Sequence, residues 1–253
     1  MVSTNIWQGI YNSFQDAPTQ GPGFLGRTWV TNSLAKLRAF QEGSDKDTSM
    51  RSLPAHSNTM LPFIAAMLAR GTGMLHILDY GGGIGETYVK TRAALPAEVQ
   101  VDYHIVELPQ VCEAGRCFFH GKSDIKFHET LPSKGPFDIA HFGSSLHYLD
   151  DWLSPLAQVR ELGINKLLFF DLPAGDIPNF VTLQRYYDSL IPVRFFNQTE
   201  LVASIEALGY SLIYRARCRS VILGEEQPLQ LDDFPVTHRL RHTSIMLFDV
   251  VEV

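Results

Sequence analysis

The chain has 253 residues, of which 45% are hydrophobic and 19% charged, as expected for a soluble globular protein with room for one large domain. Its formal net charge of −6 argues against a general nucleic-acid surface, which needs a basic footprint. No segment approaches the ~18 consecutive apolar residues of a membrane span, and the opening MVSTNIWQGIY lacks the basic and apolar regions of a signal peptide.

Residues 1–57 precede the regular α/β pattern and are rich in aromatic side chains and turn-forming residues. Within them we predict a helix over about 28–40 and a polar loop over 41–49. An apolar segment then predicts another helix over 60–70. No second boundary is evident, so we divide the chain into an N-terminal segment and one domain over 58–253.

The stretch LHILDYGGGIGE, which starts at Leu75, predicts a buried parallel strand, a tight turn and a helix over 86–94. Four glycines fall within five positions of this turn: Gly81, Gly82, Gly83 and Gly85. Side chains there would collide with a bound ligand. The phosphate-binding fingerprint Gly-x-Gly-x-x-Gly does not fit, because its third glycine would fall on Glu86. The pattern is instead an acid, Asp79, followed by alternating glycines.

A second apolar strand, VDYHIVE over 101–107, ends in Glu107. This acid follows the last glycine of the turn by about 20 residues, where a carboxylate accepts hydrogen bonds from both hydroxyls of an adenosyl ribose. Nicotinamide cofactors share that feature, so Glu107 discriminates only together with the acid-led glycine pattern. The combination favours S-adenosylmethionine.

The remaining chain alternates between predicted helices and strands. Predicted strands cover 125–128, 137–143, 166–171, 210–220 and 243–250. Predicted helices follow Pro109, cover 150–162 with Asp150 as N-cap, and fill the segments 179–189 and 197–208. We expect Ser144, Ser145 and His147 at the end of the fourth strand to face the chemistry, together with the rim residue Asp171.

The motifs DYGGGIG and HIVELPQV resemble those of class I S-adenosylmethionine-dependent methyltransferases. The resemblance implies a Rossmann-like fold with a seven-stranded, mostly parallel sheet, an antiparallel final strand and an N-terminal helical lid over residues 1–57. It also implies that the glycine turn lies against the methionine part of the cofactor and that Asp79 helps to hold it. Leu108, Ser144 and Ser145 are further expected contacts, and Glu129 or Thr130 is expected beside the adenine.

IWQGIYNSF and GSSLHYLDDW extend the resemblance to a group of methyltransferases often encoded among surface-polysaccharide genes. That group often has glutamine where this chain has His147. LHYLDDW also partly resembles the LHxWxD stretch of small-molecule O-methyltransferases, whose histidine is the general base, although Trp152 is displaced from that pattern. We therefore expect the methyl acceptor to be a small molecule, either a sugar or a secondary metabolite. The methyl group would be transferred to a hydroxyl of this molecule, with His147 as the base.

Aromatic side chains are the expected boundary of the acceptor: Tyr11, Trp29, Tyr148 and Tyr186. Nitrogen or carbon acceptors remain open, as do a non-catalytic cofactor-binding subunit and an NAD-dependent oxidoreductase. Arg215, Arg217 and Arg219 form either a solvated strand face or an anion site.

Three cysteines without CxxC pairing indicate reduced thiols and a cytoplasmic location. No His, Cys or acid cluster has the spacing of metal ligands. The expected partner is the small-molecule methyl acceptor, with no nucleic acid and no membrane, and a homodimer is possible.

Overall fold

The computed structural model describes residues 5–46, 60–70, 73–218, 221–222, 225–226 and 228–250. Seven strands form the main sheet in this spatial order: β10 (Ser211–Cys218), β13 (Thr243–Asp249), β6 (Lys166–Leu172), β5 (Ile139–Gly143), β2 (Met74–Tyr80), β3 (Gln100–Val106) and β4 (Ile125–His128). β13 runs antiparallel to both of its neighbours, and the remaining adjacent pairs are parallel. The predicted seven-stranded, mostly parallel sheet is confirmed.

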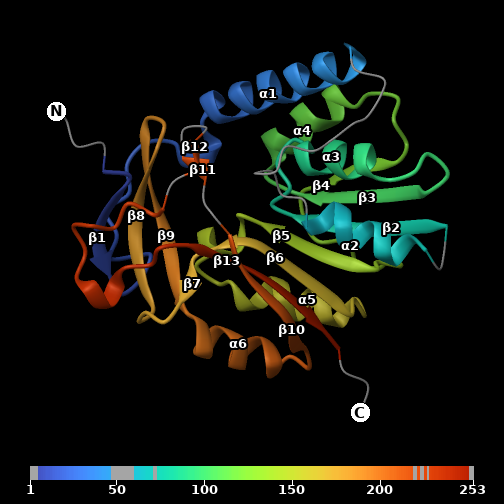
Figure 1. Ribbon diagram of the computed structural model, residues 1–253. Coiled ribbons are helices and arrows are strands. Elements are labelled where there is room, and N and C mark those ends of the chain that lie inside the picture. Colours follow the sequence, from blue (N-terminus) through green and yellow to red (C-terminus); the bar gives the residue numbers. More distant parts are fainter. Residues whose placement is uncertain are drawn as a thin grey trace.

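Helices cover both faces of the main sheet (Figure 1). The elements on one face are α1 (Arg27–Lys46), α2 (Met60–Ala69), α3 (Glu86–Ala94) and α4 (Pro109–Phe118), and those on the other are α5 (Leu153–Glu161) and α6 (Gln198–Glu206). The first face buries Leu61 and Tyr103 in its core, and the second buries Phe142 and Ile205. Because parallel strands are covered on both faces, they form continuous apolar runs, which made them recognisable in the sequence.

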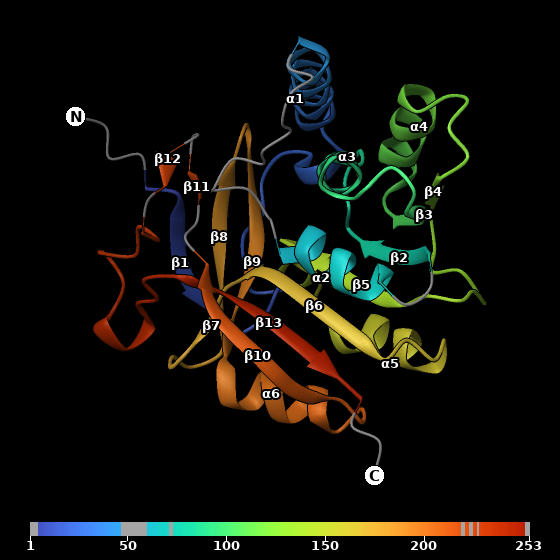
Figure 2. The same ribbon diagram turned by 45° about the vertical axis from the view of Figure 1, so that its right-hand side comes forward.

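A second, four-stranded sheet lies beside the main one (Figures 1 and 2). Its strands in spatial order are β1 (Trp7–Tyr11), β8 (Phe180–Tyr186), β9 (Ser189–Asn197) and β7 (Ala174–Gly175). The buried Thr182 hydroxyl donates to the Gly9 carbonyl oxygen over 2.8 Å and so ties the hairpin to β1. This sheet brings the beginning of the described chain against the crossover that follows β6.

The prediction of a helix over 179–189 is wrong, because β8 and β9 form an antiparallel hairpin there. Side chains of β9 alternate between buried and partly exposed positions over most of its length, with a period of two residues that suits a strand. The helix predicted to follow is confirmed as α6, and the Asn197 side chain accepts a hydrogen bond from the Glu200 N–H over 3.1 Å.

Two smaller corrections concern helix ends. α1 continues to Lys46 through most of the predicted loop at 41–49, of which 47–49 lie outside the described residues. Asp150 is not the N-cap of α5, because that helix begins at Leu153 and the Ser154 N–H donates to Asp151. Asp150 instead pairs with Arg194 of β9 at 3.3 Å.

The segment between β10 and β13 contains only short elements among its described residues. They comprise β11 (Val221–Ile222), β12 (Glu225–Glu226) and the single-turn helix η3 (Val236–His238), which follow β10. Arg215 and Arg217 are exposed on β10, and Arg219 lies outside the described residues. None of the helices in the described part of the chain is long and apolar enough to span a membrane.

Candidate active site

The glycine turn between β2 and α3 packs closely against its surroundings. A Cβ atom on Gly82 would lie 2.5 Å from an Asp79 carboxylate oxygen, so only glycine fits at this position. Gly85 has φ +98° as the N-cap of α3, and a Cβ there would lie 2.9 Å from the Phe119 ring. The turn therefore joins β2 and α3 closely, and its glycines Gly81, Gly82 and Gly83 line a neighbouring cavity.

Glu107 is fixed beside this turn at the carboxyl end of β3. Its Oε1 accepts a hydrogen bond from the Gly83 N–H over 3.3 Å, and its Oε2 accepts one from the Leu108 N–H over 2.8 Å. Burial is the main cause of a raised Glu107 pKa, and the charge of Asp79 raises it further. The two backbone donors hold the carboxylate in one orientation against the cavity.

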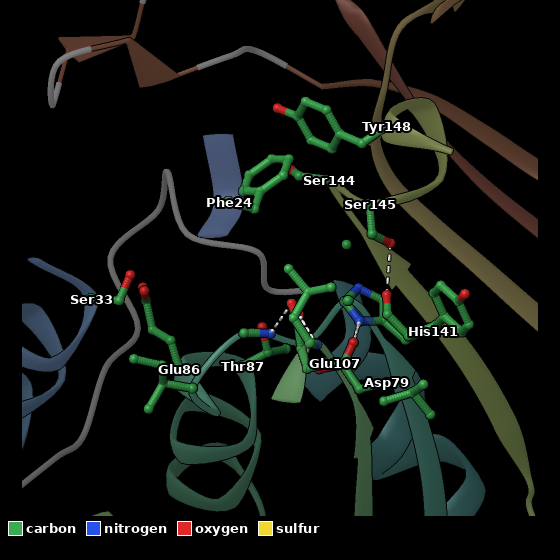
Figure 3. A pocket seen from close by; sticks show the side chains of 18 of the residues that line it. Phe24, Ser33, Asp79, Glu86, Thr87, Glu107, His141, Ser144, Ser145 and Tyr148 are labelled. Carbon is green, nitrogen blue, oxygen red and sulfur yellow. Dashed lines mark hydrogen bonds and ion pairs between the residues drawn. The ribbon is translucent and has the colours of Figure 1, made fainter. Parts of the chain in front are cut away.

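Asp79 is fully buried below the turn, and both of its oxygens are engaged within the protein. The Tyr103 hydroxyl donates to Oδ2 over 2.6 Å, and His141 Nδ1 lies 2.7 Å from Oδ1. These contacts connect β2, β3 and β5 at their carboxyl ends, as Figure 3 shows for the Asp79–His141 pair. Asp79 thus fixes the base of the site, with His141 beside it on the cavity wall.

A cavity of about 720 Å³ opens over the turn at the carboxyl ends of the central strands. Twelve residues predicted from the sequence to bind cofactor or acceptor line it: Trp29, Asp79, Gly81, Gly82, Gly83, Glu107, Leu108, Glu129, Ser144, Ser145, Tyr148 and Tyr186. The Ser145 hydroxyl donates to the Tyr80 carbonyl oxygen over 2.7 Å and so holds the end of β5 against that of β2. Glu129 is half exposed and pairs with Arg116 at 3.4 Å.

An aromatic group extends from one end of the cavity, where Phe24 and Tyr148 lie, toward the glycine turn, since a Cβ atom on Gly83 would lie 4.0 Å from the Trp29 ring. Phe24, on the single-turn helix η1 (Gly23–Leu25), contacts three other rings: those of Tyr148, Tyr186 and Trp29, with centroids 4.8, 5.1 and 5.8 Å from its own. Figure 3 shows Phe24 and Tyr148 together at this end, with Glu107 and Asp79 at the other. Phe24 was not predicted as a site residue, since it lies in an N-terminal segment without helical or strand periodicity.

Ser144 and Asp171 add polar groups near the aromatic end. The Ser144 hydroxyl donates to Asp171 Oδ2 over 2.8 Å, and the Thr243 hydroxyl donates to Oδ1 over 2.6 Å. Ser144 directly follows β5, and Asp171 is the penultimate residue of the neighbouring strand β6. Their φ angles of +52° and +58° lie in the left-handed region that non-glycine residues seldom adopt. Figure 3 shows Ser144 beside Phe24 and Tyr148.

Three predicted ligand-binding residues do not line this cavity. Gly85 contributes instead to the packing of α3, and Thr130 follows Glu129 on the exposed surface. Tyr11 lies on β1 and packs against Val181 and Leu183 of the second sheet. The sequence around Tyr11, which resembles that of the other N-terminal aromatic residues, does not indicate that its side chain packs on the second sheet and not at the cavity.

The structure does not support His147 as the base. The side chain is 5% exposed, does not line the cavity, and its Nδ1 has no hydrogen-bond partner among the described residues. Burial lowers the pKa of His147 to about 3. In the single-turn helix η2 (Leu146–Tyr148), His147 turns inward while the next residue, Tyr148, faces the cavity.

Comparison of whole structures relates this architecture to a known one. The chain matches a methyltransferase of Burkholderia thailandensis that methylates N1 of 1,6-didemethyltoxoflavin, in a structure with that compound and S-adenosylhomocysteine bound. The TM-score is 0.53 at 16% identity, over 94% of this chain and 93% of the other. The chain has the class I methyltransferase fold. Neither a protein-family model nor a curated protein sequence matches it.

Two further structures match this fold, and one of them is an enzyme of a different reaction class. The Bacillus subtilis protein YcgJ matches with a TM-score of 0.50 at 15% identity, over 76% of this chain and 98% of that one. A pericyclic reaction enzyme matches with the same TM-score at 14% identity, over 81% of this chain and 50% of the other. The fold therefore leaves the reaction to be argued from the site. None of these three matches bears on the resemblance to a surface-polysaccharide group.

Proposed function

We propose that this protein is an S-adenosylmethionine-dependent methyltransferase acting on a small molecule. The observation that carries the proposal is the Glu107 carboxylate, which two backbone N–H groups hold at the carboxyl end of β3 on the cavity wall. A carboxylate so placed, one strand from a glycine turn, suits the two ribose hydroxyls of an adenosyl group.

The other lining residues fit the rest of that ligand. Gly81, Gly82 and Gly83 expose backbone beside the methionine part, and Glu129 with Leu108 lies on the adenine side. When bound, S-adenosylmethionine supplies an electrophilic methyl group on sulfur. The protein's task is to hold the acceptor in line with that methyl group and to exclude water.

The same residues disfavour a nicotinamide dinucleotide. Glu86 begins α3 and lines the cavity, so it places a carboxylate where a pyrophosphate would seek the helix N-terminus. S-Adenosylmethionine carries no phosphate and avoids this repulsion. The methyltransferase of Burkholderia thailandensis, with S-adenosylhomocysteine and a small molecule bound, supports the same choice.

On the side proposed for the acceptor, residues of the N-terminal segment 1–57 and Tyr186 of the second sheet line the cavity. Phe24 and Trp29 come from that segment, and we propose that it acts as a lid over the acceptor. A hydroxyl remains our first choice of acceptor group, with ring nitrogen and carbon as alternatives. His147 is left out of this mechanism because it does not line the cavity.

Calorimetric titration tests the cofactor. S-Adenosylhomocysteine and S-adenosylmethionine are expected to bind the wild-type protein, with no binding of NADH. Glu107→Gln removes the charged acceptor of the ribose hydroxyls and is expected to weaken binding about tenfold or more. Glu113→Gln, an exposed site on α4, serves as the matched control.

Two results would contradict the proposal: absence of binding by both sulfur compounds, or equal affinity of the wild type and Glu107→Gln. Binding without methyl transfer to any acceptor would indicate a non-catalytic subunit instead. Release of S-adenosylhomocysteine from a panel of small molecules separates these two functions.

A further inference from the structure

The acceptor end of the cavity combines flat apolar walls with a carboxylate. Phe24, Trp29, Tyr148 and Tyr186 come from four different elements, yet Phe24 contacts the other three. Rings at several angles to one another enclose a flat molecule better than a branched one, through stacked and edge-to-face contacts. This wall therefore offers a planar ring both stacked and edge-to-face contacts.

Asp171 is the carboxylate at this end. It lines the cavity, and its negative charge contributes to raising the pKa of Tyr148, so it lies within electrostatic reach of the aromatic group. The Tyr148 hydroxyl is directed to the Gln184 side chain, to which it donates over 2.8 Å. Tyr148 thus offers its ring to the aromatic wall. Two carboxylates of the cavity act on this wall, Asp171 on Tyr148 and Glu107 on Tyr186, and Glu107 is the one already assigned to the ribose.

The backbone around Asp171 is held in an unfavourable conformation. Ser144 and Asp171 are two of the three non-glycine residues with positive φ in the described chain, and they are hydrogen-bonded to each other at the cavity. Such conformations are unfavourable for non-glycine residues and concentrate at functional sites. Donors on both oxygens, Ser144 and Thr243, orient the carboxylate so that it cannot rotate freely.

We propose that Asp171 accepts the hydrogen bond of the methyl acceptor, and that this acceptor is a planar aromatic or heteroaromatic molecule carrying an O–H or N–H group. The inference rests on the proposed methyltransferase function and adds the substrate class and its recognition residue. It assigns to Asp171 the role that the sequence suggested for His147.

The chemical step balances with Asp171 as the proton acceptor. The lone pair of the acceptor oxygen or nitrogen forms the bond to the methyl carbon, the carbon–sulfur bond breaks, and its electron pair stays on sulfur. The O–H or N–H proton passes to the Asp171 carboxylate. The products are the methylated ring, S-adenosylhomocysteine and a protonated Asp171, which returns its proton to water.

Matched probe pairs test the proposal in the presence of S-adenosylhomocysteine. Each pair differs only by methylation of the donor: 7-hydroxycoumarin and 7-methoxycoumarin, 2-naphthol and 2-methoxynaphthalene, indole and 1-methylindole. Dissociation constants are measured by calorimetry at a pH where the hydroxyl groups are protonated. For at least one pair, the wild type is expected to bind the donor-bearing member about tenfold or more tightly, as for a hydrogen bond to a charged group.

Two variants distinguish the contribution of the carboxylate to probe binding from that of the aromatic wall. Asp171→Asn keeps a residue that tolerates the left-handed conformation, and it is expected to reduce the donor preference to less than about threefold. Trp29→Ala is expected to weaken both members of a pair alike and leave their ratio unchanged. Asp176→Asn, an exposed site a few residues later, is the matched control.

S-Adenosylhomocysteine affinity reports separately on the fold and on the proposed function. It is expected to be unchanged in Asp171→Asn, which shows that the variant is folded with its cofactor side intact. If the wild type binds S-adenosylhomocysteine but shows no donor preference in any pair, or if Asp171→Asn keeps that preference, the inference is overturned while the proposed function stands. If the wild type does not bind S-adenosylhomocysteine, both fail.

Discussion

Tyr103 donates its hydroxyl to Asp79 across 2.6 Å, and neither residue is exposed to solvent. Burial, together with the adjacent carboxylate, raises the pKa of Tyr103 well above its usual value. The phenol therefore stays protonated and acts as a permanent donor. Because a buried carboxylate is costly without donors, this contact supports the base of the glycine turn.

Tyr103→Phe removes that donor and leaves a buried carboxylate oxygen without it. We expect the free energy of unfolding to fall by about 1.5–3 kcal/mol, the usual range for a hydrogen bond to a charged group. Urea denaturation followed by circular dichroism measures this change. Tyr214→Phe, at an exposed site on β10, is the control, and an equally small loss in both variants would contradict the expectation.

Glu107→Gln is expected to change how the free energy of unfolding depends on pH. Because the folded-state pKa of Glu107 is raised, the stability that its proton provides is fully present below pH 4.5 and is lost as the pH rises through the folded pKa. The amide does not ionise, although its single oxygen can accept only one of the two backbone hydrogen bonds that the carboxylate accepts. Unfolding free energies measured from pH 7 to pH 5 should therefore show the wild type gaining stability relative to the variant as the pH falls. A difference between the two proteins that is independent of pH would contradict this account.

The free energy of unfolding of His147→Leu is expected to rise relative to that of the wild type as the pH is lowered. The unfolded histidine takes up a proton below about pH 6.5, whereas the folded one, with its pKa lowered to about 3, does not. Wild-type stability is therefore lost as the pH falls through this window, by up to about 1.4 kcal/mol per pH unit for this group. Leucine removes the loss and also the unpaired Nδ1.

The measurement for His147→Leu is the free energy of unfolding at pH 7, 6 and 5 in both proteins. The remaining histidines are the same in both proteins, so the difference between their unfolding free energies isolates residue 147. His120→Leu, which changes an exposed histidine on the surface, is the control. Parallel pH profiles for the wild type and His147→Leu would show that the buried histidine is charged in the folded state.

The meeting of Asp79, the glycine turn and Glu107 at the cavity was predictable because its signals are local. Asp79, the glycine turn and Glu107 lie on strands whose apolar runs and ends are visible in the sequence, and parallel strands bring those ends to one edge. The main sheet followed from the same runs. For these residues, the positions of the strand ends in the sequence are enough to predict which side chains meet in the structure.

The acceptor side depends on contacts between distant segments, which a pattern of neighbouring residues does not encode. Tyr186 faces the cavity because β8 belongs to a hairpin, whereas a helix had been predicted there. His147 and Tyr148 differ by one position in a single helical turn, and that turn places the tyrosine at the cavity and the histidine inside. Phe24 lies in the single-turn helix η1, and the rings that it contacts come from distant segments of the chain, among them Tyr148.

The pairing of β1 with β8 has a consequence for the order in which the protein is made. Thr182 and Gly9, joined by a hydrogen bond, are 173 positions apart in the chain. At about 5–20 residues per second, a ribosome needs roughly 10–35 s to add that many residues. During that interval β1 has no partner strand. The aromatic wall of the cavity, to which Tyr186 of β8 contributes, is therefore completed well after the glycine turn and Glu107 have been synthesised.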